Sequence, residues 1–86
     1  MNQHFKMKVN DLFIIGNKVV FAGDLETDEV QISNADCKIL VDGIETSRIN
    51  INGEVMGTCH RDLWTTSSVE IERSVVVSHD VWLVSI

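Results

Sequence analysis

Apolar and polar residues alternate along most of this chain, in the pattern of β-strands that bury one face. Residues 5–9 read Phe-Lys-Met-Lys-Val, and a period of two places every second side chain on the same side of a strand. The segment 81–86 is apolar on both sides, which is typical of a strand covered on both faces. We expect strands over residues 5–9, 12–15, 18–22, 30–32, 37–41, 44–49, 49–52 and 81–86, and a further strand with Val69, Ile71, Val75 and Val77 on one side.

Glycine, asparagine and aspartate mark the turns, because the chain has no proline. Asp42-Gly43 between two β-prone runs favours a type I′ hairpin, since both central residues tolerate a positive φ. Gly16-Asn17 marks another turn, and Gly23 inside a strand indicates a bulge or a close backbone approach. Residues 54–56 continue a strand, whereas 57–64 form a loop or one helical turn. We therefore expect one all-β domain over residues 1–86, a small closed or partly open antiparallel β-barrel of about six or seven short strands.

Composition and charge narrow the classes of function. The chain has 86 residues and a formal net charge of −6, which disfavours non-specific nucleic-acid binding unless a local basic patch overrides it. No apolar run approaches the length that spans a bilayer, and no apolar stretch of a signal peptide follows Met1. We expect a small acidic cytoplasmic protein with reduced cysteines and no membrane association.

Several short motifs follow a family pattern. Residues 7–13 read Met-Lys-Val-Asn-Asp-Leu-Phe, and Ile14-Ile15-Gly16, Val20-Phe21 and Gly23-Asp24-Leu25-Glu26 follow at regular spacing. The closing Asp80-Val81-Trp82-Leu83 looks like a last strand of the form Asp-x-Val-x-Leu. Together these stretches resemble the second, β-barrel domain of elongation-factor-type translational GTPases. The resemblance covers about half of the chain, and residues 54–76 depart from it.

This resemblance implies an isolated barrel, because no Gly-x4-Gly-Lys-Ser/Thr motif of a GTPase is present. In that family the barrel contacts ribosomal RNA or the acceptor end of tRNA, or packs on a neighbouring domain. An RNA contact needs a basic face, for which Lys6, Lys8, Lys18 and Lys38 are the candidates. Lys6 and Lys8 share one side of their strand.

Cysteines, histidines and carboxylates form no recognisable catalytic or metal-binding pattern. Cys59 and His60 are adjacent, so on a strand they point to opposite faces and are poorly placed to share a proton. With Cys37 and His79 they also lack the spacing of a local zinc chelate. Four carboxylates cluster without the calcium-loop pattern: Asp24, Glu26, Asp28 and Glu29. We expect no catalytic residue, no metal and no cofactor.

Candidate binding residues lie in the irregular segment and in the last strand. Trp64, with Arg61 nearby, either anchors a partner or plugs one end of the barrel. In the last strand we expect the bulkier set, Trp82 with Val84 and Ile86, to face the core. That orientation leaves Val81 and Leu83 outside, where with residues 75–77 they would form an exposed apolar patch of the kind that marks interfaces. The candidate binding residues are therefore Trp64, Arg61, Val81 and Leu83.

The function that these patterns favour is a non-catalytic binding module. A protein partner, or a second copy in a homodimer, would dock on the C-terminal strands. The alternative is an RNA or ribosome contact like that of the translation-factor barrel. An enzyme that uses Cys59 or His60 is the least favoured hypothesis.

Overall fold

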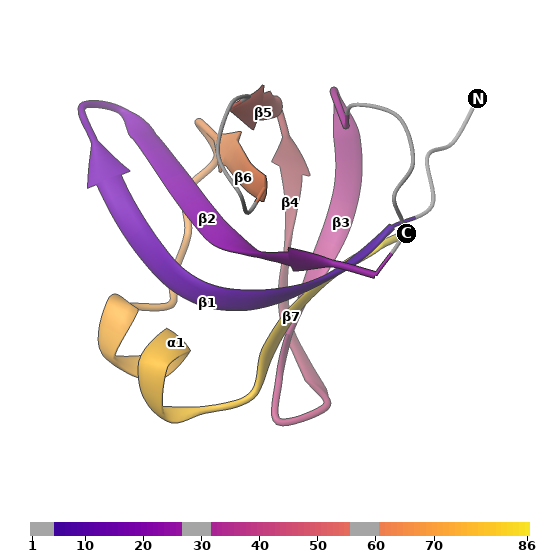
Figure 1. Cartoon of the computed structure of the whole chain (residues 1–86), viewed down its shortest axis with the longest axis vertical. Coiled ribbons are helices and arrows are strands. Elements are labelled where there is room, and N and C mark those ends of the chain that lie inside the picture. The colour runs from indigo at the N-terminus through magenta and orange to yellow at the C-terminus, as the bar shows by residue number, and fades with distance from the viewer. Residues whose placement is uncertain (1–4, 27–31, 56–60) are drawn as a thin grey trace.

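The computed structural model of this chain describes residues 5–26, 32–55 and 61–86 (Figure 1). Within these ranges the elements in chain order are β1 (Lys6–Ile15), β2 (Lys18–Leu25), β3 (Ala35–Val41), β4 (Ile44–Ile51), β5 (Gly53–Val55), β6 (Arg61–Thr65), α1 (Arg73–Ser78) and β7 (Val81–Ser85). The expected all-β fold class is confirmed, with one helix of six residues added to it.

All seven strands lie in one sheet of order β4-β3-β7-β1-β2-β6-β5, in which every neighbouring pair is antiparallel. The two edge strands come close, since only Asn52 separates β4 from β5. The Thr65 hydroxyl donates a hydrogen bond to the Asn50 carbonyl at 2.6 Å, and the Asn52 amide donates to the Trp64 carbonyl at 2.9 Å. No strand pairing among the described residues joins the two edges, so the sheet is not closed and the barrel stays a prediction.

Alternate residues of the strands fill one core. Phe21 on β2 and Leu63 on β6 stand directly opposite each other and are fully buried. Aliphatic side chains supply most of the remaining volume, as the shortage of aromatic residues requires. The core residues are Phe5, Met7, Val9, Leu12, Phe21, Ile32, Ala35, Cys37, Ile39, Ile49, Ile51, Leu63, Val76, Val81 and Leu83.

A bulge in β1 keeps both halves of this long strand on the core. Val9 pairs with Gly23 and Asp11 pairs with Ala22, so Asn10 is an extra residue. The insertion shifts the alternation by one position, which lets Val9 and Leu12 both face inward. The sequence pattern predicted separate strands over residues 5–9 and 12–15. In the structure Asp11 does not separate them, because residues 6–15 form the single strand β1. The close approach predicted at Gly23 is confirmed, because a Cβ there would lie 1.9 Å from the carbonyl oxygen of Lys8.

The β3–β4 hairpin has the backbone that its sequence predicts. Asp42 and Gly43 both adopt positive φ, at 52° and 84°, as a type I′ turn requires. In the β1–β2 hairpin Gly16 has a φ of 61°, which glycine adopts without steric cost.

The orientation predicted for the last strand is wrong. Val81 and Leu83 are fully buried, whereas Trp82 and Val84 are half-buried and Ile86 is 50% exposed. Because β7 lies between β1 and β3, Leu83 stands opposite Met7 and Ile39, and both of these neighbours face the core. The prediction placed the bulkier side chains in the core. An indole in the core needs a hydrogen-bond partner for its N–H, and Trp82 has such a partner, Asp80, outside the core.

The strand predicted around Val75 is also wrong, because Arg73–Ser78 form the helix α1. Val76 is buried against the core, Val75 is half-buried, and Val77 is 60% exposed. The β-propensity of three valines is overridden by this packing. Conversely, residues 61–65 form strand β6 where we expected a loop or a helical turn.

Most of the strand expected at 30–32 lies outside the described residues, but Ile32 is buried and its amide donates to Glu54 Oε1 at 3.0 Å.

In the ranges that the structure covers, the single helix falls far short of the length needed to cross a membrane.

Candidate binding surfaces

Trp64, the principal binding candidate from the sequence, lies on the outer face of the sheet. Its neighbours in β6, Leu63 and Thr65, are fully buried, so Trp64 points to the other side. There it stands opposite Val20 and Gly53, with the Lys18 ammonium 4.5 Å from its ring centroid. Trp64 therefore does not plug an end of the core. The backbone of Arg61 pairs with Gly23, whereas its side chain lies outside the described residues.

Apolar side chains gather beside Trp64 on the β1–β2 hairpin, the long curved ribbon in Figure 1. Phe13 pairs with Val20, which in turn pairs with Trp64. Phe13 is 43% exposed, and Ile15, two residues further on the same side, is 63% exposed. We call Phe13, Ile15 and the half-buried Trp64, together with the buried Val20 that lies between Phe13 and Trp64, the hairpin surface. Exposed apolar side chains that lie close together, as Phe13 and Ile15 do, mark interaction sites on soluble proteins.

The end of this hairpin is apolar on its other side as well. Ile14, which points opposite to Phe13 and Ile15, is 75% exposed. Three consecutive large apolar residues are thus in contact with solvent. The remaining exposed large hydrophobics stand apart from one another along the chain: Ile44, Val55, Val77 and Ile86. The apolar patch expected on the C-terminal strands is therefore wrong, because Val81 and Leu83 belong to the core.

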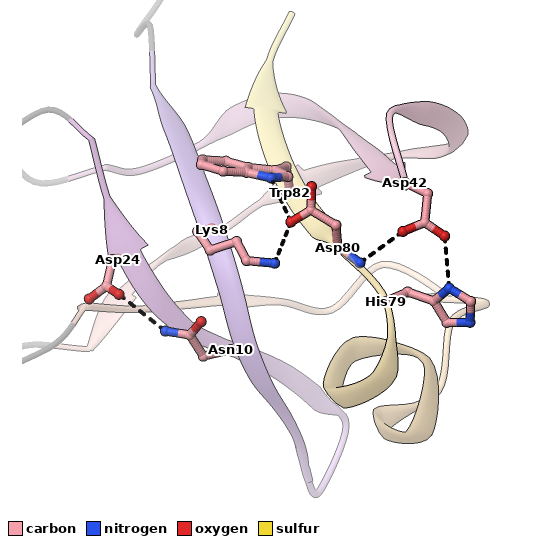
Figure 2. Close-up of polar contacts among 7 residues, drawn as sticks. All are labelled: Lys8, Asn10, Asp24, Asp42, His79, Asp80 and Trp82. Carbon is pink, nitrogen blue, oxygen red and sulfur yellow. Dashed lines mark hydrogen bonds and ion pairs between the residues drawn. The ribbon is translucent and has the colours of Figure 1, made fainter.

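A second surface surrounds Trp82 on the outer face of β7 (Figure 2). The ammonium of Lys6 lies 4.6 Å from the centroid of the indole ring and that of Lys8 lies 6.0 Å from it. The indole N–H donates to Asp80 Oδ1 at 3.2 Å, and Lys8 Nζ forms an ion pair with the same oxygen at 2.6 Å. The Lys8 ion pair lowers the pKa of Asp80. Asp80 therefore holds the indole and one ammonium together.

A histidine–carboxylate pair borders this surface at the β3–β4 turn. His79 Nδ1 lies 2.8 Å from Asp42 Oδ2, and the Asp80 amide donates to Asp42 Oδ1 at 3.0 Å. These two contacts, the amide of Asp80 first, lower the pKa of the Asp42 carboxyl. The pair fixes the turn against the end of α1 and gives His79 a structural role.

Three cations, on β1, β3 and β4, form a row beside Trp82 that crosses β7 at Val84. Lys6 on β1 stands opposite Val84 on β7, Val84 stands opposite Lys38 on β3, and Lys38 stands opposite Arg48 on β4. Arg48 is bonded to Glu45, with Nε 3.0 Å from Oε2. We call Lys6, Lys38 and Arg48 the cation row. Lys18, the fourth lysine considered for a basic face, lies away from this row, over Trp64.

The described part of the chain contains one cysteine, and it lies in the core. Cys37 is free and fully buried, and its desolvation, with a smaller contribution from Asp36, raises the pKa of the thiol to about 12. In residues 5–26, 32–55 and 61–86 no three His, Cys, Asp or Glu side chains gather as a metal site. Asp24 accepts a hydrogen bond from Asn10 at 3.2 Å. Cys59, His60, Asp28 and Glu29 lie outside the described residues.

Comparison of the chain with protein-family models, with curated proteins and with solved structures gave no match.

Proposed function

We propose that this domain is a non-catalytic interaction module that binds a protein partner through the hairpin surface. The observation that carries the proposal is the exposure of Phe13 and Ile15 on the same side of the sheet as the indole of Trp64, with Ile14 exposed on the other side of the same strand end. Leaving such side chains in water costs roughly 25 cal/mol for each Å² that a partner would cover. The fold buries other large apolar side chains completely, for example Val81 and Leu83. The exposed side chains at the hairpin end therefore contribute little to the stability of the fold.

Charge also favours a protein at this surface. The two outer rows that form it, Ile15 with Lys18 and Phe13 with Val20, Trp64 and Gly53, carry one charged residue, Lys18. The chain as a whole has 13 acidic residues against 7 basic ones. Protein interfaces are depleted of charge in their centres and enriched in aromatic residues, and the hairpin surface has both properties.

The experiment compares two isoleucines of similar exposure, each next to a hairpin turn. Ile15 and Ile44 each flank a two-residue hairpin turn, and they are 63% and 69% exposed. In a pull-down from native lysate the wild-type domain recovers a stoichiometric partner. Ile15→Asp abolishes this recovery, because it buries a charge at the contact, whereas Ile44→Asp retains it. Equal recovery by both variants contradicts the proposal.

A second copy of the chain is the other protein that this surface could bind. Static light scattering of the purified domain separates the two cases. A homodimer that becomes monomeric in Ile15→Asp, but not in Ile44→Asp, identifies the second copy as the occupant. A monomer at high concentration leaves a different protein as the partner.

An RNA or ribosome contact, which the resemblance to the translation-factor barrel implies, is the alternative function. It is supported by Lys6, Lys8 and Lys38 on one face with Trp82, since single-stranded nucleic acids bind cations and aromatic rings together. The carboxylates of Asp24 and Asp80 on the same face, and the net charge of −6, count against it. Filter binding to tRNA and ribosomes at low salt tests it: binding that falls steeply with salt supports this function, and its absence excludes it.

The same proposal includes a barrel fold and a cytoplasmic location. The curved sheet forms a partly open barrel, which is supported by the hydrogen bonds that connect β6 with residues 50 and 52 near the opposite edge. The protein works in the cytoplasm, which agrees with a free Cys37 thiol in the core.

A further inference from the structure

We propose that the outer face of β4, β3, β7 and β1 binds an acidic peptide segment of a protein partner, at the cation row beside Trp82. This site lies on a different part of the sheet from the hairpin surface and has the opposite chemistry. It therefore goes beyond the proposed function, and the two proposals can fail separately.

The first argument is the energetic cost of the row. Lys38 and Arg48 are directly opposite each other on β3 and β4, and like charges in that position destabilise a sheet. Glu45 pairs with Arg48 and relieves part of the repulsion. Among the described carboxylates none forms an ion pair with Lys6 or Lys38. Lys6 lies over the Trp82 ring and Lys38 has Glu45 as a nearby opposite charge, and neither ammonium is held in an ion pair. Both can therefore take an anionic ligand on either side of Val84.

The second argument is that the surface is prearranged. Lys8 and Trp82 are both bonded to Asp80, and Lys6 lies over the indole ring. Leu40, opposite Trp82 on β3, and Val84 are half-buried, so apolar contact area lies between the cations. A ligand with carboxylates and apolar side chains finds partners for both kinds of group without rearranging the sheet.

The dimensions of the row suit an extended peptide. Neighbouring strands lie about 4.8 Å apart, so the distance from β4 to β1 across two intervening strands is about 14 Å. An extended peptide rises about 3.4 Å per residue, and four residues therefore cover the row. Alternate side chains of such a peptide point the same way, about 7 Å apart, which lets successive acidic residues reach different cations of the row.

The same face is less suited to RNA. The Lys6 ammonium occupies a position over the Trp82 ring, where a stacked base would lie. Glu45, Asp80 and Asp24 border the row, Asp24 being opposite Lys8 on β2. A continuous phosphate chain would be repelled by these carboxylates, whereas a short peptide has to contact the cation row alone.

The test is an NMR titration that uses the two indole N–H signals as reporters. The probe is an eight-residue peptide with four glutamates, and its control is the same peptide with glutamine at those positions. The acidic peptide shifts the Trp82 signal and leaves that of Trp64 unchanged. Its affinity falls with rising salt, and the glutamine peptide causes no shift. No shift at Trp82 in low salt overturns the proposal.

Variants locate the site and separate it from the hairpin surface. Lys38→Glu weakens peptide binding about tenfold or more, which corresponds to about 1.4 kcal/mol. Lys18→Glu, which alters an exposed lysine over the other indole, leaves it unchanged, and so does Ile15→Asp. Lys38→Gln replaces Lys38→Glu if the latter does not fold. Equal affinity of wild type and Lys38→Gln, or tighter binding of a single-stranded RNA of equal charge at Trp82, overturns the proposal.

Discussion

At the scale of single residues, Gly23 decides how closely two strands can approach. A Cβ at this position would lie 1.9 Å from the Lys8 carbonyl oxygen and 3.1 Å from the Cα of Val9. Both neighbours are backbone atoms next to the bulge, so no change of side-chain rotamer relieves the clash. The glycine therefore allows β1 and β2 to stay paired where the bulge changes their register.

Gly23→Ala is expected to destabilise the domain by about 3 kcal/mol, the upper part of the range for overpacking. Gly16→Ala is the matched control, because a Cβ there meets nothing within 4 Å and only the positive φ opposes it. That control should cost about 1 kcal/mol. Urea unfolding measures both values, and a Gly23→Ala variant as stable as wild type would contradict the described approach of the strands.

Some residue-level features follow from sequence and others do not. The positive φ of Asp42 and Gly43 and the tight site at Gly23 are predictable, because turns and close approaches select particular residue types. The exposure of Trp82 is not, since burial of an indole depends on which neighbours the register supplies. In β7 those neighbours are Lys8 and Leu40 on the outside and Met7 and Ile39 in the core.

At the scale of elements, clear alternation predicted which face of a strand is buried, and apolar runs did not. Residues 5–9 alternate, and their inward face of Phe5, Met7 and Val9 agrees with the structure. Residues 75–77 and 81–86 are apolar on both sides, so the period carries no information about which face is buried. The bulge at Asn10 is hidden for a similar reason: the sequence does not reveal which residue the ladder will skip.

The helix α1 covers the core through one valine. Val76 is 3% exposed and Val77 is 60% exposed, although the two residues are adjacent. Val76→Ala should destabilise the domain by about 2 kcal/mol, because it removes two buried methyl groups and leaves a cavity. Val77→Ala should change stability by less than about 0.5 kcal/mol. Equal effects in urea unfolding would show that this segment is not helical as described.

At the scale of the whole molecule, the sheet presents two surfaces of different character. The hairpin surface is apolar and has one flanking cation, whereas the face around Trp82 has four cations interleaved with carboxylates. Sequence analysis predicted a protein interface and named Trp64, and it placed the apolar patch on Val81 and Leu83. The patch could not be located from sequence, because Phe13–Ile15 have the same composition as a buried strand.

The central claim is that the hairpin surface contacts a protein, and site-specific photo-crosslinking tests it most directly. A benzophenone amino acid replaces Ile15 in one variant and Ile44 in the other, and both variants are irradiated in native extract. The account predicts one discrete protein adduct at position 15 that position 44 does not give. The same adducts from both positions, a nucleic-acid adduct, or no adduct at position 15 would contradict it.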